Sequence, residues 1–172
     1  MPDLAQTLAR ARVPLGFFAG AMVLWLAHPT AGSLAAGGAL ALVGEAIRFW
    51  AAGHLEKGRE VTSSGPYRHS RHPLYLGSTL IAAGVAVASA RWSVGLLLAA
   101  YMISTISAAI RHEEANMRAA FGDDYDRYRS SLATPSDRSF SLARAVKNRE
   151  HRTVAGLLLI AAVFAFKAWR HP

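Results

Sequence analysis

Two clusters of polar residues lie beside long apolar runs in this sequence. In the first cluster, residues 65–77, Arg71 and His72 directly precede Pro73 and an apolar stretch. Proline at the first turn of a helix loses no hydrogen bond, and the free amides of that turn attract anions. Arg71 and His72 add hydrogen-bond donors at the same place. The cluster therefore indicates a site for a carboxylate or a phosphate.

The same cluster also has a plainer interpretation. Arg68 and Arg71 are placed where basic residues anchor a membrane helix on its cytoplasmic side. Tyr67 and Tyr75 are placed where aromatic residues form a belt at the membrane surface. On these residues alone, both interpretations stay open.

The second cluster contains two adjacent carboxylates, Glu113 and Glu114, at the end of another apolar run. The two charges repel each other, and a negative charge is unfavourable at the carboxyl end of a helix. Neutralisation by Arg111, Arg118 and solvent is one explanation. The other is a ligand that brings an ammonium group and ribose hydroxyls to carboxylate acceptors, and a carboxylate to an anion site. S-adenosylmethionine has all of these groups.

Long apolar runs must form the elements that position both clusters. Hydrophobic residues make up 52% of the chain, and its mean hydropathy is +0.21. A helix needs roughly 17–25 residues to cross the hydrocarbon layer of a membrane. Five runs reach or approach that length: 13–27, 31–52, 74–90, 92–110 and 154–166. The sequence therefore predicts an all-α, polytopic membrane helix bundle of about five spans, with the first run retained and not removed as a signal peptide.

We expect one domain over residues 1–172, with its last helix at about 152–169. Between the fourth and fifth spans, apolar side chains at helical spacing predict an amphipathic helix over residues 111–129, lying across the mouth of the bundle. Its apolar face consists of Met117, Phe121, Tyr125 and Tyr128. In the second span, Glu45 and Arg48 are three residues apart, and this spacing predicts an ion pair, with a role in a channel for the acceptor as the alternative.

Lysine and arginine predict the orientation, because cytoplasmic loops close to membrane helices carry an excess of them. Arg10 and Arg12 precede the first span, and the connections after the second and fourth spans are also rich in basic residues. The other side holds only Arg91, Lys167 and Arg170. We therefore expect a cytoplasmic N-terminus, cytoplasmic connections that carry every candidate site residue, and a C-terminus outside.

The composition also excludes several classes of function. The net charge of +8 comes from these basic loops, which suit an anionic membrane surface and not nucleic acid. The chain has no cysteine, which excludes disulfides, thiolate metal sites and cysteine nucleophiles. A metal site at His69, His72 and His112 is not expected, because the spacing HxxH is a weak signal. Gly16 and Gly20 can bring two helices close together, but the oligomeric state stays open.

Three motifs occur in order along the chain. They are G-P-Y followed by R-H-P-x-Y-x-G within residues 65–77, R-x-E-E at 111–114, and F-G-x-x-Y-x-x-Y at 121–128. Together they resemble the isoprenylcysteine carboxyl methyltransferase and phospholipid methyltransferase families, which are integral membrane enzymes that use S-adenosylmethionine. The resemblance covers about residues 44–130. It implies a methyltransferase of the bacterial plasma membrane whose lipophilic acceptor enters from the bilayer.

The resemblance also implies roles for particular residues. The first motif would hold the methionine and adenosine parts of the cofactor through Tyr67, Arg71, His72, Pro73 and Tyr75. Glu113 and Glu114 would take its amino or ribose groups, and Tyr125 and Tyr128 would close the pocket. Arg111 and Glu114 are the candidate catalytic residues.

Methyl transfer is a direct displacement, and alignment of the reacting groups supplies much of its rate. A carboxylate acceptor, as on a prenylated cysteine, needs no strong base, and Arg111 can steer it. An amine acceptor, as in phospholipid N-methylation, must lose a proton to one of the available bases, Glu113, Glu114, His72 or His112. We expect the carboxylate, with the amine as the alternative. An NADPH-dependent membrane reductase and a non-catalytic scaffold are further alternatives, although the paired carboxylates would repel an anionic cofactor and have no role in a scaffold.

Overall fold

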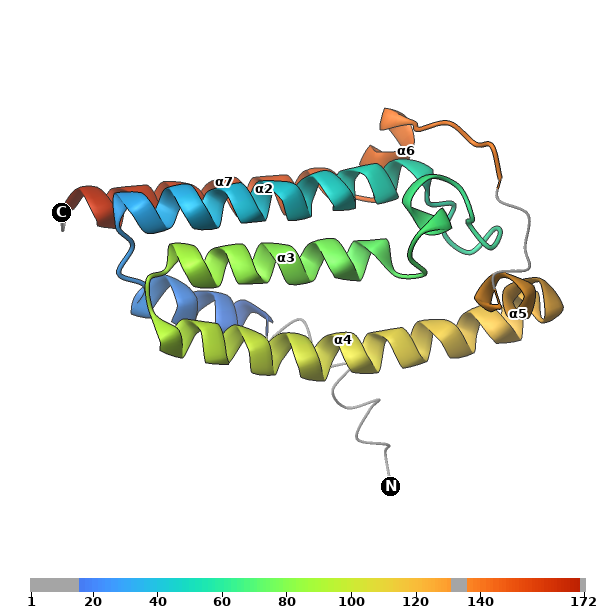
Figure 1. The fold of residues 1–172 in the computed structure, drawn as a ribbon, viewed down its shortest axis with the longest axis horizontal. Coiled ribbons are helices and arrows are strands. Elements are labelled where there is room, and N and C mark those ends of the chain that lie inside the picture. Colours follow the sequence, from blue (N-terminus) through green and yellow to red (C-terminus); the bar gives the residue numbers. More distant parts are fainter. Residues whose placement is uncertain (1–15, 131–135, 171–172) are drawn as a thin grey trace, which may run out of the picture.

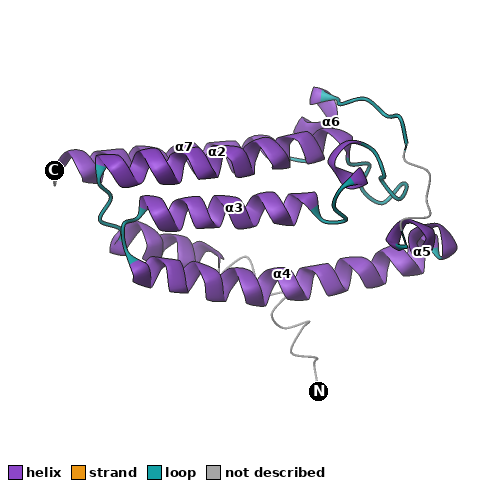
Figure 2. Ribbon diagram, viewed as in Figure 1, coloured by secondary structure: helices purple, strands orange, loops and turns teal. Residues whose placement is uncertain are grey.

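The computed structural model describes residues 16–130 and 136–170, and within these ranges every regular element is a helix (Figures 1 and 2). Five apolar helices correspond to the five predicted runs: Gly16–Leu26, α2 (Ala31–His54), α3 (Pro73–Ala88), α4 (Trp92–Phe121) and α7 (Glu150–Arg170). The shorter helices are η1 (Gly65–Arg68), α5 (Asp123–Arg129) and α6 (Leu142–Lys147). The all-α prediction is confirmed. The N-terminal arginines and residues 13–15 of the first predicted run lie outside the described residues.

The apolar helices have the lengths and surfaces of membrane helices. α2, α4 and α7 are each long and apolar enough to cross a membrane, whereas Gly16–Leu26 and α3 are apolar but shorter. Large side chains on these helices are exposed, among them Phe17, Trp25, Leu96 and Leu158. Such a surface is unfavourable in water, but lipid tails are as apolar as the side chains themselves. The fold is therefore a membrane helix bundle.

α2 and α3 pack with their backbones close together, because glycines line the contact. A Cβ atom on Gly44 would lie 2.7 Å from the Gly77 carbonyl oxygen, and a Cβ atom on Gly37 would collide with the Gly84 carbonyl oxygen. Small residues allow this close approach of membrane helices. The α2–α3 hairpin thus fixes where α2 ends and α3 begins, which is the place of the first motif.

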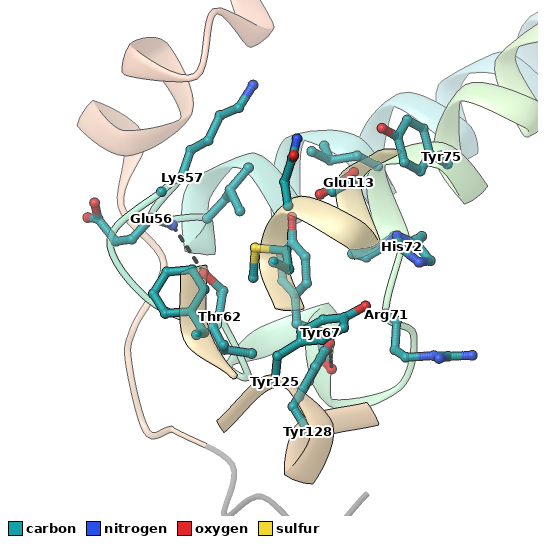
Figure 3. Close-up of a pocket in the computed structure, with 18 of the residues that line it drawn as sticks. Glu56, Lys57, Thr62, Tyr67, Arg71, His72, Tyr75, Glu113, Tyr125 and Tyr128 are labelled. Atoms are coloured by element: carbon teal, nitrogen blue, oxygen red, sulfur yellow. Dashed lines mark hydrogen bonds between the residues drawn. The ribbon is translucent and has the colours of Figure 1, made fainter. Parts of the chain in front are cut away.

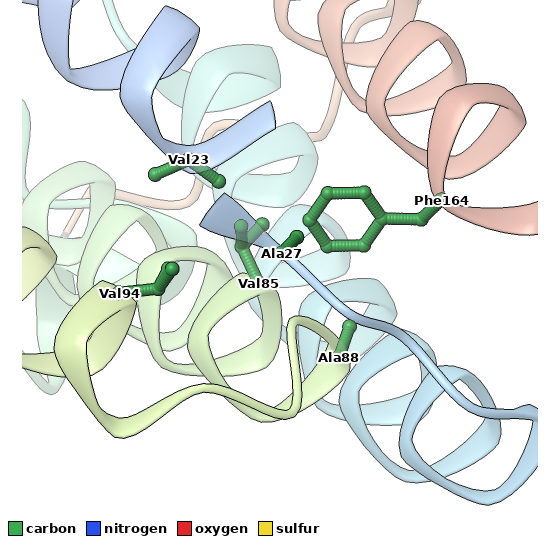
Figure 4. Close-up of a cluster of buried hydrophobic side chains, with 6 residues drawn as sticks. All are labelled: Val23, Ala27, Val85, Ala88, Val94 and Phe164. Carbon is green, nitrogen blue, oxygen red and sulfur yellow. The ribbon is translucent and has the colours of Figure 1, made fainter. Parts of the chain in front are cut away.

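The apolar core lies where the first helix, α3, α4 and α7 meet (Figure 4). Its buried members are Val23, Ala27, Val85, Ala88, Val94 and Phe164. The predicted small-residue pair of the first helix is only partly used. A Cβ atom on Gly16 would lie 2.8 Å from Tyr101 Oη, whereas nothing lies within 4 Å of such an atom on Gly20.

α4 extends past the predicted fourth span, because the helix continues through residues 111–121. It ends at Gly122, whose φ of +47° and ψ of −121° suit glycine, and α5 then runs in a new direction (Figure 1). The single amphipathic helix predicted over residues 111–129 is therefore two helices. Glu113 and Glu114 lie inside α4, so their predicted position at a helix C-terminus is wrong.

Candidate active site

A cavity of about 570 Å³ lies at the end of the bundle where α2 ends and α3 begins (Figure 3). Its walls come from the loop 55–62, from η1, from the start of α3, and from the second half of α4 together with α5. The polar motifs, which are far apart in the sequence, therefore meet around one cavity.

Most of the predicted site residues line this cavity: Tyr67, Arg71, His72, Pro73, Tyr75, Glu113, Tyr125 and Tyr128. The two predicted catalytic residues, Arg111 and Glu114, do not line it. Arg111 is exposed, and residues two apart on a helix point to different sides. Because Glu113 faces the cavity, Arg111 is turned away from it.

Glu114 does not line the cavity itself, but it contacts two residues of the first motif that do. Its Oε1 atom lies 3.2 Å from His72 Nε2 and 3.7 Å from Arg71 Nη1. The His72 ring lies beside the Tyr75 ring, with 5.8 Å between their centroids. Glu114 therefore orients side chains of the R-H-P motif, and the first and second motifs are in direct contact.

Three tyrosines form the wall where α5 meets η1. Tyr128 Oη donates a hydrogen bond to the Tyr67 carbonyl oxygen at 2.9 Å, and the Tyr125 and Tyr128 ring centroids are 6.4 Å apart. Burial raises the pKa of Tyr128 to about 12, and it also raises the pKa of Tyr67 and Tyr125. The three hydroxyls are thus neutral at neutral pH. The Tyr125 hydroxyl is buried and makes no hydrogen bond to any residue that the structure describes.

The apolar face predicted from helical spacing is found in the cavity wall. Met117, Phe121, Tyr125 and Tyr128 all line the cavity, the first two from α4 and the others from α5. The helix breaks between the two pairs at Gly122. The four residues therefore lie on one side as predicted, but the continuous helix that was to carry them is wrong.

The loop 55–62 belongs to the site, although sequence reasoning did not include it. Glu56, Lys57, Glu60 and Thr62 line the cavity, and the Glu56 amide donates a hydrogen bond to Thr62 Oγ1 at 3.2 Å. The available signal was the charged stretch 56–60, four residues before the G-P-Y motif. Charge alone does not distinguish the wall of a site from a solvated loop, so this signal was not sufficient.

Arg48 of α2 also lines the cavity, and its partner is not the predicted one. Its guanidinium pairs with Glu150 of α7, with Nε 2.7 Å from Oε1 and Nη2 3.0 Å from Oε2. Further hydrogen bonds run to Leu74 O, Ser78 Oγ and Thr153 Oγ1. The predicted pair with Glu45 does not form, because α7 brings Glu150 into the better position. Both Glu45 carboxylate oxygens are buried without a hydrogen-bond partner among the described residues.

The carboxylates in the cavity wall differ in how they are neutralised. Arg144 Nε donates to Glu56 Oε1 at 2.9 Å, and Arg138 Nη2 donates to Glu60 Oε2 at 2.7 Å. Glu113 has no ion pair or hydrogen bond within the part of the chain that the structure describes. The cavity therefore presents one free carboxylate, beside several aromatic rings, to a cationic ligand group.

Comparison with known proteins adds a family to this geometry. Residues 33–124, more than half of the chain, match the family model described as phospholipid methyltransferase. No curated protein and no solved structure matches the chain. The matched range contains the first two motifs and all of α4, and it ends at the start of α5.

Proposed function

The chain belongs to the phospholipid methyltransferase family, and from this membership we propose that it transfers a methyl group from S-adenosylmethionine to a lipophilic acceptor. The observation that carries the proposal is the cavity in which the R-H-P motif and Glu113 face one another. The family resemblance implied cofactor binding for both.

The residues of the cavity fit this cofactor. Its volume of about 570 Å³ is within the range of roughly 300–1,000 Å³ that is usual for small-molecule sites. Glu113 can accept hydrogen bonds from an ammonium group or from ribose hydroxyls, and the unpartnered Tyr125 hydroxyl can pair with a polar ligand atom. The aromatic rings favour a cation close to their faces. When bound, the cofactor supplies an electrophilic methyl group on a sulfonium centre.

The protein contributes orientation and the exclusion of water. Arg71 and His72, held by Glu114, can donate to a ligand carboxylate at the start of α3. The loop 55–62 and the tyrosines of α5 cover the sides of the cavity. Holding donor and acceptor in line replaces a collision between two free molecules by a reaction within one complex.

Two observations favour an amine acceptor over the carboxylate that the sequence led us to expect. Arg111, which was to steer a carboxylate, lies outside the cavity lining. His112 lines the cavity beside Glu113 and can take the proton that an amine nitrogen must lose before its lone pair attacks the methyl carbon, which leaves Glu113 to the cofactor.

A carboxylate acceptor, as in isoprenylcysteine carboxyl methyltransferases, is the second candidate. It is favoured by Lys57, which lines the cavity and forms no ion pair with the described residues. For either acceptor, entry from the bilayer is supported by Thr105 and Ala109, which extend the cavity wall into the apolar half of α4. The distribution of lysine and arginine supports a site on the cytoplasmic side of the membrane, which we propose to be a bacterial plasma membrane.

The identity of the cofactor is tested by calorimetric titration. The detergent-purified full chain is titrated with S-adenosylhomocysteine and, in parallel, with NADPH. We expect saturable binding of the first ligand only, and weaker binding in Glu113→Gln. Binding of NADPH alone would identify a reductase. Binding of neither ligand to protein whose circular dichroism spectrum is helical would contradict the proposal and favour a scaffold.

The acceptor is tested with S-adenosylmethionine that carries a radiolabelled methyl group and with membrane lipids as acceptors. Methyl esters release volatile methanol in alkali, whereas N-methyl groups are stable. We expect label that stays non-volatile after alkaline treatment. Label that becomes volatile would show carboxylate methylation and reverse the preference for an amine.

A further inference from the structure

The segment 136–148, which we call the strap, lies after the residues matched by the family and runs against the end of α2 (Figure 1). It contains the short helix α6. Phe140 of the strap packs on Phe49, with 5.5 Å between ring centroids, and against Gly53, where a Cβ atom would collide with the Phe140 ring. The strap is thus seated on α2 by apolar contact as well as by hydrogen bonds.

The strap caps the carboxyl end of α2. The last carbonyl groups of a helix have no partner within the helix. The Gly53 carbonyl oxygen accepts from the Ser141 amide at 3.1 Å and from Arg144 Nη1 at 2.6 Å. Asn148 Nδ2 donates to the carbonyl oxygens of Ala52 and Leu55, each at 2.9 Å. These bonds fix the direction in which the chain leaves α2 and enters the loop 55–62.

The strap also holds the charged side chains of that loop. Arg144 donates to Glu56, and Arg138 donates to Glu60. Both carboxylates line the cavity, and the side chains of Arg144 and Glu56 are only 17% and 21% exposed. Charge-assisted hydrogen bonds of this kind are roughly twice as strong as neutral ones. Without the strap, Glu56 and Glu60 would lose these arginine partners, and the loop 55–62 would lose the ion pairs that hold it.

We propose that Arg144 is a positioning residue for ligand binding: through Glu56 and the Gly53 carbonyl it holds the loop 55–62 as one wall of the cavity. Arg144 itself does not line the cavity. The inference rests on the proposed function, because the ligand used to test it is the cofactor product. It assigns a role in the site to residues outside the range that defines the family.

The first measurement is the affinity of the full chain for S-adenosylhomocysteine. Arg144→Ala should raise Kd by about tenfold, since hydrogen bonds to charged groups correspond to changes of this size. Arg59→Ala is the matched control, because Arg59 is an exposed cation in the same loop and its side chain forms no ion pair with the described residues. We expect the control to bind like the parent protein.

The second measurement separates positioning from general destabilisation. In hydrogen exchange without ligand, Arg144→Ala should speed exchange of the amides of residues 55–62 and leave the α3 amides as protected as in the parent protein. The double variant Glu56→Ala, Arg144→Ala should bind S-adenosylhomocysteine no more weakly than the single variant of lower affinity. The reason is that each change removes the same contact, which holds the loop 55–62 in place.

The outcomes are distinguishable. Arg144→Ala with parental affinity and parental exchange in the loop would overturn the inference, and so would a uniform increase of exchange over all helices. If Arg144→Ala does not fold, Arg138→Ala decides instead, because it releases Glu60 and keeps the caps of α2. If the parent protein does not bind S-adenosylhomocysteine, the proposed function fails, while the exchange of the loop still tests the strap.

Discussion

Successive residues of an α-helix are about 100° apart, and this angle divides the roles of Glu113 and Glu114. Glu113 faces the cavity and has no ion pair within the described residues. Glu114 points to the first motif, where it pairs with His72 and Arg71. The two carboxylates are adjacent in the sequence but have different surroundings in the structure: Glu113 lines the cavity, and Glu114 pairs with the first motif.

Replacing Glu114 by glutamine should weaken cofactor binding. The change removes the negative charge that holds His72 and Arg71, and we expect Kd for S-adenosylhomocysteine to rise by about tenfold. Asp126→Asn is the control, because Asp126 pairs with Arg118 in an exposed ion pair on the same side of the membrane. Calorimetry measures both variants. If Glu114→Gln binds S-adenosylhomocysteine with the affinity of the parent protein, Glu114 has no role in cofactor binding.

The buried tyrosines predict a pH dependence. The pKa of Tyr128 is raised from its ordinary value of 10.0 to about 12, mainly by burial. A raised pKa means that the folded state holds its proton more tightly, so the contribution to stability is complete below about pH 10 and is lost as the pH rises towards 12. Tyrosinate absorbance of the folded protein should show a group that titrates late and is missing in Tyr128→Phe. An unchanged titration curve in that variant would contradict the assignment.

At the scale of elements, the contact between α2 and α3 depends on two glycine pairs. Gly37→Ala should destabilise the protein by about 1–3 kcal/mol, because its Cβ atom would collide with the backbone of α3. Gly38→Ala is the matched control on the same helix, since nothing lies within 4 Å of a Cβ atom at that position. Thermal unfolding in detergent compares the two. Equal unfolding temperatures of the two variants would show that α2 and α3 can move apart at position 37 without a loss of stability.

The link between α2 and α7 is ionic. Glu150 is buried, and its removal leaves Arg48 without its counter-charge, so Glu150→Ala should cost roughly 3–5 kcal/mol in the free energy of unfolding. Asp137→Ala breaks an ion pair whose carboxylate is 99% exposed, and it should cost less than about 1 kcal/mol. Denaturation of the purified variants measures the difference. A similar decrease in the free energy of unfolding in both variants would mean that the ion pair between Arg48 and Glu150 contributes little to stability.

At the scale of the whole molecule, the bundle places its chemistry at one end. The apolar helices form the part that suits the bilayer, and the cavity lies where the loop 55–62, the start of α3 and the α4–α5 break come together. The proposed reaction, between a water-soluble cofactor and a lipophilic acceptor, requires a site that both molecules can reach. The end of a membrane bundle meets this requirement.

The orientation is open to a direct test because the chain has no cysteine. A single cysteine introduced as Arg59→Cys should be shielded in intact spheroplasts from a membrane-impermeant maleimide and labelled after lysis. A single cysteine introduced as Arg91→Cys should be labelled in the intact spheroplasts. The opposite pattern would place the cavity outside the cell and contradict the orientation predicted from the basic residues.

The apolar helices and part of the cavity lining could be predicted from the sequence alone. Length and hydropathy of a run are local properties, so four of the five apolar helices could be predicted within a few residues, whereas α4 continues beyond its apolar run to Phe121. The resemblance of the three motifs to the family implied a site at the tyrosines, the R-H-P cluster and Glu113, and these residues line the cavity. Gly122 marks the limit of such reasoning, because the helical spacing of residues 111–129 continues across a break in the backbone.

The contacts between residues far apart in the sequence could not be predicted without the three-dimensional structure. Arg48 pairs with Glu150, far along the chain, and not with Glu45 on its own helix. Arg111 is turned away from the cavity, and the strap supplies Arg138 and Arg144 to the loop before the first motif. Periodicity records the face of a helix on which a side chain lies. It does not record which other helix packs there, because that depends on how all the helices fit together.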